Sequence, residues 1–207
     1  MPRPYALGKR SEPKNETRAR IVAAAARVYR ERGTAAASNL AIAREADVAP
    51  ATVRNHFPDP QELANAVFDV VLADLRPPTP AIYDGIEGIR GKVTRLATEL
   101  AAFHDRSSAA WQMYIQDPGM IEAWSSRVEW YNRELDELMR LALGPLERDR
   151  MALDLVAAVI GSPAFIALRS RGLSSRQAAA LCVEVVVPWL ETRAAAKVRA
   201  TPKTRRR

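Results

Sequence analysis

Residues 38–57 read SNLAIAREADVAPATVRNHF, and this stretch decides the fold. Its apolar residues fall at the offsets that two short helices need in order to pack across a tight turn. The expected inward positions are Ile42, Ala43, Ala46, Val48 and Val53. Asp47 stands in the turn, where a residue that tolerates a left-handed backbone is needed. The pattern predicts a helix-turn-helix, whose second helix typically enters the major groove of DNA.

Further helices are expected on both sides of this motif. An apolar stripe with helical spacing predicts a first helix over residues 15–32. Ser38 is the expected N-cap of the second helix, and Pro50 is the expected first-turn residue of the third. The sequence DPQE at residues 59–62 predicts the start of a fourth helix, which the proline cluster of residues 76–80 ends.

Helical patterns continue towards the C-terminus. They cover residues 82–105, 107–116, 120–143, 147–171 and 174–195. Pro163 and Pro188 fall inside the last two and are expected to kink them. The composition, with 48% hydrophobic residues and 9 glycines in 207 residues, also favours helices over strands. The expected fold class is all-α, with an N-terminal three-helix helix-turn-helix DNA-binding domain followed by a helical ligand-binding and dimerisation domain.

The charge distribution suggests basic arms on a mildly acidic body. The net charge is +7, but the first 20 residues carry six basic side chains against two acids, and residues 197–207 carry six and no acid. Such arms suit contact with a polyanion, although the C-terminal one could equally serve only solubility. The expected domains are a basic disordered arm (1–14), the helix-turn-helix domain (15–58), the helical domain (59–195, with a linking helix at 59–76 and dimerisation helices at 147–195) and a basic disordered tail (196–207).

The remaining composition bears on location. Cys182 is the single cysteine, which leaves no partner for an intramolecular disulfide and fits a reducing compartment. No run of 18 apolar residues occurs, and the first residues carry charge where a signal peptide would be apolar. The expected location is cytoplasmic, with no membrane partner.

Two segments near the C-terminus, residues 155–168 and 178–190, are apolar around nearly their whole circumference. Such helices need to pack against other helices on more than one side, and a second copy of the chain would supply these helices in a two-fold bundle. The residues expected in this homodimer interface are Val159, Phe165, Leu181, Val185 and Trp189. The alternative is that both segments are central helices of one monomeric core.

Residues 17–67 resemble the TetR family of bacterial transcriptional regulators. The residues that carry the resemblance are Ile42-Ala43, the ADV turn at Asp47, Thr52-Val53, Phe57 and Glu62-Leu63. The resemblance implies about nine helices, a homodimer formed largely by the last two long ones, and a small-molecule pocket whose ligand releases repression. The sequence departs from the family's usual Gly at Asp47, Ser at Ala49, Tyr at Arg54 and His56, and Ser-Lys at 59–60.

The helix over residues 50–56 is expected to enter the major groove. Arg54 and Asn55 are the first choices for base reading, because Arg pairs with guanine and Asn with adenine through two hydrogen bonds. Phosphate contact is the alternative for both. The residues expected to contact DNA are Lys14, Arg18, Ser38, Asn39, Arg44, Pro50, Ala51, Thr52, Arg54, Asn55 and His56. One such unit makes few base contacts, so a dimer on a pseudo-palindromic operator of double-stranded DNA is expected.

Aromatic side chains gather in the middle of the chain. They suggest a cavity for a small-molecule effector of unknown class, although aromatic residues at helical spacing are more often plain core. The residues expected to bind this ligand are Phe103, Trp111, Tyr114, Trp124 and Trp130.

Two other functions are compatible with a helical chain. An enzyme is disfavoured because the chain has two histidines, one cysteine, no phosphate-binding glycine loop and no Gly-x-Ser-x-Gly motif, so neither catalytic residues, a metal site nor a cofactor is expected. A helical sensor or partner-binding module that no longer reads DNA is the other alternative. DNA binding that weakens steeply as salt rises would separate a DNA reader from such a module.

Overall fold

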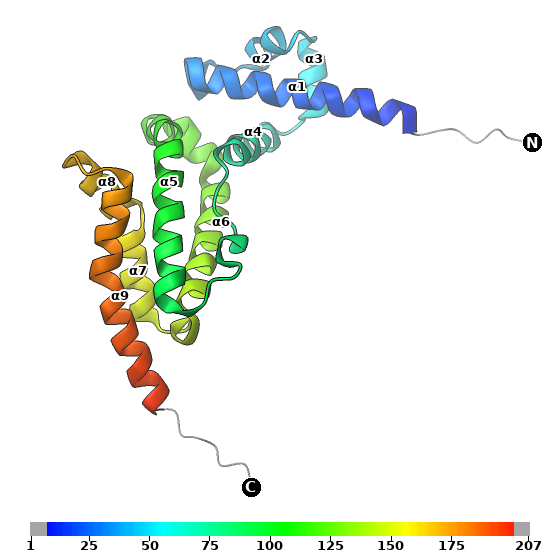
Figure 1. Ribbon diagram of the computed structural model, residues 1–207. Coiled ribbons are helices and arrows are strands. Elements are labelled where there is room, and N and C mark those ends of the chain that lie inside the picture. The colour runs from blue at the N-terminus through cyan, green and yellow to red at the C-terminus, as the bar shows by residue number, and fades with distance from the viewer. Residues whose placement is uncertain (1–7, 201–207) are drawn as a thin grey trace, which may run out of the picture. The chain divides into compact units, whose positions relative to one another are not determined.

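The computed structural model describes residues 8–200, which are helical almost throughout (Figure 1). The helices are α1 (Gly8–Arg32), α2 (Asn39–Ala46), α3 (Pro50–His56), α4 (Pro60–Leu75), α5 (Gly88–Gln116), α6 (Pro118–Leu143), α7 (Arg150–Ile160), α8 (Ser162–Ser170) and α9 (Ser175–Ala200). Short 3-10 turns, η1 (Thr34–Ala36), η2 (Pro80–Tyr83) and η3 (Gly144–Leu146), join some of them. No strand occurs among residues 8–200, so the all-α fold class is confirmed. Of the arm expected at 1–14 and the tail expected at 196–207, residues 8–14 are helical as part of α1 and residues 196–200 as part of α9, and the rest lies outside the described residues.

The chain forms two compact units. The N-terminal unit comprises Met1–Leu75 together with Ala109–Val128, and the C-terminal unit comprises Arg76–Ser108 and Glu129–Arg207. The first division falls at the proline cluster that follows α4. The sequence-based domain boundary at residue 59 differs from this division, because α4 and the tip of the α5–α6 hairpin belong to the N-terminal unit.

Local signals build the helix-turn-helix as expected. The Ser38 hydroxyl oxygen accepts a hydrogen bond from the Ala41 N–H at 3.2 Å and so caps α2. Asp47 adopts the left-handed conformation at φ 52° and ψ 55°, which turns the chain towards α3. Pro50 occupies the first turn of α3, where no amide hydrogen is needed. Ala43 and Val53 are 1% and 0% exposed, so α2 and α3 pack through the predicted small and apolar residues.

The tip of the α5–α6 hairpin completes the core of the N-terminal unit. Trp124 of α6 is 3% exposed and lies between aromatic rings of three other elements. Its ring centroid is 6.5 Å from Tyr29, 5.3 Å from Phe68 and 6.2 Å from Tyr114, the last in a stacked arrangement. The indole N–H donates to the carbonyl oxygen of Ala64 at 2.9 Å, which satisfies its one polar group.

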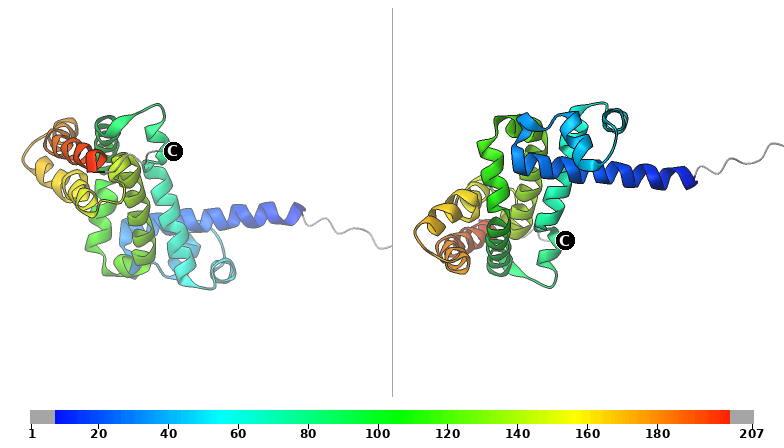
Figure 2. Two further views of the ribbon diagram at one scale, coloured as in Figure 1. Left: turned by 90° about the horizontal axis from the view of Figure 1, so that it is seen from below. Right: turned by 90° about the horizontal axis from the view of Figure 1, so that it is seen from above.

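The C-terminal unit is a helical bundle, as both views of Figure 2 show, and it packs around its own hydrophobic core. Residues of α5, α6, α7, α8 and α9 contribute, with Leu96, Leu143 and Leu190 fully buried. The Tyr83 hydroxyl donates to the carbonyl oxygen of Leu138 at 2.9 Å and so fastens η2 to α6. This burial also raises the pKa of Tyr83 far above its ordinary value, so the phenol stays a donor.

Two predicted helix boundaries in this unit are wrong. The helix expected over 82–105 begins only at Gly88 and continues to Gln116 without the expected break, because Gly85 and Gly88 have positive φ angles and no breaking residue follows until Asp117-Pro118. The helix expected over 147–171 begins at Arg150. It is broken at Gly161 into α7 and α8, whereas the sequence predicted only a kink at Pro163. Gly161 is extended, and a Cβ there would stand 2.2 Å from the Ala157 carbonyl oxygen.

One stretch, Arg150–Ser170, is long and apolar enough to cross a membrane by composition alone, and only 22% of its apolar window is buried. It is not one continuous helix, because it is interrupted at Gly161. Its Val156, Ile160 and Phe165 pack into the core of the C-terminal unit. The segment is therefore partly a core element and partly an exposed apolar surface.

Candidate nucleic-acid interface

The outward face of α3 carries the side chains expected to read bases. Ala51, Arg54 and Asn55 are exposed, whereas Val53 points into the core of the N-terminal unit. Thr52 is half-buried beside them. Because adjacent positions on a helix point about 100° apart, burying Val53 directs its polar neighbours outward. The exposed face of α3 is therefore polar and carries a guanidinium and an amide, the two groups best suited to base edges.

Arg18 of α1 holds the carboxyl end of α3. Its guanidinium Nη1 donates to the carbonyl oxygen of His56 at 2.8 Å. The same guanidinium lies 4.0 Å above the ring centroid of Phe57, which is itself buried. A cation at a helix C-terminus also suits the helix dipole. Arg18, which was expected to contact DNA, thus also helps to fix the position of α3.

We expect replacement of Arg18 by Ala to lower the free energy of unfolding by about 1 kcal/mol, the typical size of an exposed cation–π contact with one hydrogen bond. Arg18→Lys keeps the charge but loses the planar contact, so it should restore part of the loss. Urea unfolding of the three proteins measures both effects. Equal stability of Arg18→Ala and the unchanged protein would show that the contact contributes nothing.

His56 follows in the last turn of α3, and its pKa is lowered. Partial burial is the largest cause, and the nearby cations Lys14 and Arg18 add to it. A lowered pKa leaves the imidazole neutral at physiological pH, so it offers one N–H donor to a phosphate.

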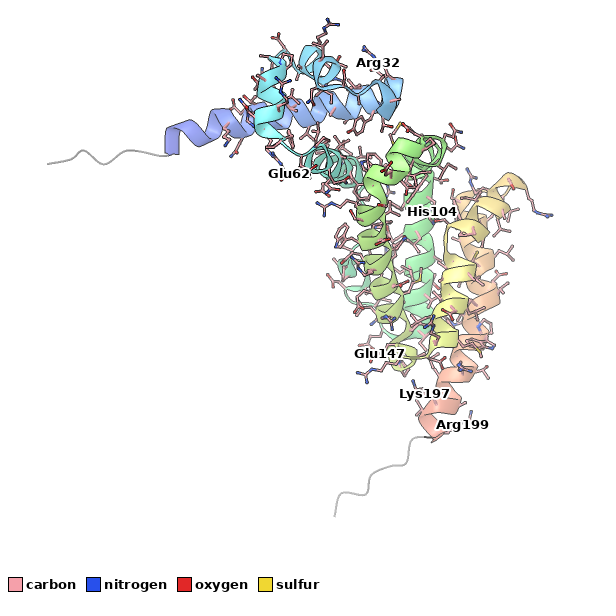
Figure 3. The ribbon with its side chains drawn as sticks, turned by 180° about the vertical axis from the view of Figure 1, so that it is seen from behind. Arg32, Glu62, His104, Glu147, Lys197 and Arg199 are labelled. Carbon is pink, nitrogen blue, oxygen red and sulfur yellow. The ribbon has the colours of Figure 1, made fainter. Side chains whose placement is uncertain are left out.

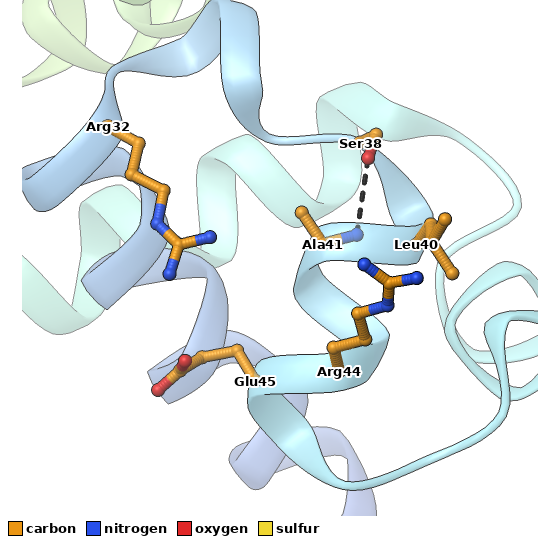
Figure 4. Close-up of a pocket in the computed structure, with 6 residues that line it drawn as sticks. All are labelled: Arg32, Ser38, Leu40, Ala41, Arg44 and Glu45. Carbon is orange, nitrogen blue, oxygen red and sulfur yellow. Dashed lines mark hydrogen bonds between the residues drawn. The ribbon is translucent and has the colours of Figure 1, made fainter.

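A groove of about 280 Å³ opens between the end of α1 and the helix α2 (Figure 4). Its lining residues are Arg32, Ser38, Leu40, Ala41, Arg44 and Glu45. The carboxylate of Glu45 is paired with Arg27 at 2.7 Å, which leaves Arg32 and Arg44 as the charges of the groove. Two guanidinium groups beside an N-capping hydroxyl suit a phosphate oxygen. Arg32 was not expected at this site, because nothing in the spacing shows that the end of α1 lies beside α2.

The other residues expected to contact DNA also belong to the N-terminal unit. Lys14 is exposed on α1, Asn39 is exposed at the start of α2, and Pro50 is half-buried at the start of α3. Their contact with DNA remains a prediction.

The five residues expected to bind a ligand are divided between the two units. Trp111, Tyr114 and Trp124 belong to the N-terminal unit, where Trp111 packs edge-on against Tyr114 at 5.4 Å. Phe103 and Trp130 belong to the C-terminal unit, with Phe103 fully buried and Trp130 39% exposed. Trp124 is thus a core residue of the DNA-binding unit, as described above. Ligand binding by these residues remains a prediction.

The residues expected in the dimer interface also separate into two groups. Phe165 is 6% exposed and packs in the core of its own chain, with its ring 5.2 Å from His104, and Val159 and Trp189 lie partly buried against that core. Leu181 and Val185 on α9 are 40% and 61% exposed. Of the five residues expected in the interface, Leu181 and Val185 are therefore the ones whose side chains are accessible to a second copy of the chain.

A family model covers the helix-turn-helix part of the chain. Residues 21–67 match the family model described as bacterial regulatory proteins, tetR family. A structural comparison gives a crystal structure of RolR in complex with resorcinol, with 18% sequence identity, a TM-score of 0.48, and coverage of 93% of this chain and 98% of that chain. No curated protein sequence matches the chain.

Proposed function

This chain belongs to the tetR family of bacterial regulatory proteins and is a DNA-binding transcriptional regulator, and we propose that it is a repressor. In this proposal two copies bind one pseudo-palindromic operator, and a small molecule in the C-terminal unit releases them. The observation that carries DNA reading is α3, a helix buried through Val53 that exposes Arg54 and Asn55. The cations around the groove and on α1 would fix its register on phosphates.

The exposed apolar side chains of the C-terminal unit support a homodimer. Three large apolar side chains are about 60% exposed, namely Met151 on α7 (59%), Ile166 on α8 (62%) and Val185 on α9 (61%). Leu181 on α9 is 40% exposed. Exposed apolar side chains that form one contiguous patch mark an interaction surface, and the proposed dimer would bring these four into such a patch. A second copy is the partner that a two-reader mechanism needs, since a two-fold dimer places two α3 helices on one duplex.

A group of buried polar side chains in the C-terminal unit supports an effector site. His104, labelled in Figure 3, and Tyr131 are 9% and 4% exposed, and Ser107 is fully buried. The hydroxyls of Ser107 and Tyr131 have no hydrogen-bond partner within residues 14–199, and the Ser162 hydroxyl lies 3.3 Å from one ring nitrogen of His104. Unpaired buried hydroxyls each cost about 1 to 3 kcal/mol, which a hydrogen-bonding ligand would offset.

The same group limits the chemistry of that effector. Phe103 supplies an aromatic wall, with its ring centroid 5.8 Å from that of Tyr131. The pKa of His104 is lowered, chiefly by burial, so its ring is neutral. A neutral molecule with a hydroxyl or carbonyl group fits these side chains better than an ion.

We infer that regulation of transcription by this route involves no catalysis and takes place in the bacterial cytoplasm, where the operator would be. No group of three or more His, Cys, Asp or Glu side chains suited to a metal occurs in the described part of the chain.

Selection of duplexes from a random-sequence pool by the purified protein tests the proposal. We expect enrichment of an inverted repeat whose half-sites lie about one helical turn apart, with binding that weakens steeply as salt rises. A pool that remains random after selection, in low salt as well as physiological salt, would contradict DNA reading and favour a helical module that binds another partner.

The buried state of His104 predicts a pH dependence of stability. Burial lowers its pKa, against a smaller opposing effect of Asp105. The unfolded state therefore takes up a proton first as pH falls, and the free energy of unfolding should decrease below about pH 6.5, the unfolded pKa. Thermal unfolding between pH 7 and 5 measures this decrease, and His104→Gln should make it smaller. The pKa of His56, the other histidine of the chain, is also lowered, so the variant that carries both His56→Gln and His104→Gln should show a smaller decrease than either single variant. An unchanged profile in His104→Gln would contradict the assignment.

A further inference from the structure

Asp117, between α5 and α6, binds the turn that precedes α2. Its carboxylate accepts hydrogen bonds from the Thr34 N–H at 2.7 Å and from the Thr34 hydroxyl at 2.6 Å. A third hydrogen bond comes from the N–H of Met120 at 3.2 Å. Burial alone would raise the pKa of Asp117, but these hydrogen bonds outweigh it and lower the pKa, so the group is ionised. Both donors of Thr34 are thus taken by one charged acceptor.

Two glycines allow this close approach. A Cβ at Gly119 would stand 2.3 Å from the Thr34 hydroxyl oxygen, a distance that no real contact has. Gly33 has a φ of 73°, and a Cβ there would stand 3.2 Å from a carboxylate oxygen of Asp117. Larger residues would therefore push Thr34 and Asp117 apart.

Thr34 is joined through the backbone to the start of α2. Its carbonyl oxygen accepts from the Ala37 N–H at 3.0 Å, and the Ser38 N–H donates to Ala36 at 3.0 Å. Ser38 then caps α2 through its side chain. The position of Thr34 therefore sets where α2 begins, and α2 carries Arg44 and packs against α3.

We propose that Asp117 is a positioning residue for DNA binding, which fixes the start of α2 through both donors of Thr34 without contacting DNA itself. The proposal rests on the proposed function. It gives a role to an acid that lies between the helices expected over residues 107–116 and 120–143. The tip of the α5–α6 hairpin is then part of the DNA-binding apparatus, in addition to α4.

The direction in which one substitution changes the affinity for DNA separates this role from a general effect of charge. Asp117→Asn removes a negative charge, which by the field of the protein alone should strengthen binding to a polyanion. The amide, however, has one acceptor oxygen where the carboxylate has two, and its NH2 group would face a Thr34 donor. The positioning role therefore predicts weaker binding, by about tenfold, the effect expected when one charge-assisted hydrogen bond is lost.

The experiment measures affinity for the duplex that the unchanged protein enriches, at a temperature where circular dichroism shows every variant folded. Asp117→Asn and Thr34→Val should each weaken binding about tenfold, and the double variant should be no weaker than the worse single one, because both remove the same interaction. Thr34→Ser keeps both donors and should bind normally. Asp69→Asn removes an equal charge, from an exposed pair with Arg127 at 2.7 Å in the same unit, and should bind as tightly as the unchanged protein or more tightly.

Unweakened binding by either Asp117→Asn or Thr34→Val, or full additivity in the double variant, would overturn the positioning role while leaving the proposed function intact. If Asp117→Asn does not fold, Thr34→Val and Thr34→Ser still decide the outcome. Failure of the unchanged protein to enrich any duplex would instead overturn the proposed function, and this inference with it.

Discussion

Replacement of Val185 by Glu is expected to convert the protein to monomers and to weaken operator binding by about 100-fold or more, the usual gain from joining two binding units. Val185 is 61% exposed on α9, so the substitution should leave the core of the chain intact. In the proposed dimer its side chain is buried, and an unpaired carboxylate there costs several kcal/mol. Light scattering gives the mass, and fluorescence anisotropy on the enriched duplex gives the affinity.

The matched control is Val198→Glu. Val198 lies on the same helix and is 64% exposed, but it stands about 220° around the helix axis from Val185 at 100° per residue. The same charge at this position should leave both the mass of the dimer and its affinity for the enriched duplex unchanged. A Val185→Glu protein that remains dimeric would show that the interface lies elsewhere.

Replacement of Arg54 by Ala is expected to weaken binding to the enriched duplex at least tenfold, while the dimer and the fold persist. Arg54 is exposed on α3, so its loss leaves no cavity, and a bidentate contact with guanine contributes about 1 to 3 kcal/mol. Anisotropy on the enriched duplex and on random DNA measures specific and non-specific binding separately.

The two measurements also separate the two roles open to Arg54. A base contact predicts loss only on the enriched duplex, whereas a phosphate contact predicts a uniform loss and a salt dependence reduced by about one unit. Arg133→Ala is the charge-matched control, because Arg133 is exposed on α6 in the C-terminal unit. Unchanged binding by Arg54→Ala would show that α3 is not the reading helix.

The helix-turn-helix could be predicted because its signals are local. Ser38, Asp47 and Pro50 each act on neighbouring backbone, as a cap, a left-handed turn residue and a first-turn proline. The break at Gly161 was missed although its signals are also local, since Gly161 is extended and Pro163 stands in the first turn of α8. The prediction followed helical spacing, which is the same on both sides of the break.

Contacts between distant segments could not be predicted from spacing. Trp124 was expected in a ligand cavity, but its packing against Tyr29 and Phe68 depends on where the α5–α6 tip lies. Asp117 and Thr34 are 83 residues apart, and nothing in either local sequence indicates their pairing. Apolar periodicity likewise could not tell that Phe165 faces its own core while Val185 faces outward, because both helices are apolar on most sides.

The central claim is that two joined copies read DNA through α3. The most direct test measures the stoichiometry and the affinity of binding to two duplexes, the enriched one and one in which a half-site is scrambled. We expect two chains on each enriched duplex, and an affinity at least about 100-fold lower when one half-site is scrambled. One chain per duplex, with equal affinity for the intact and the scrambled sequence, would contradict the account.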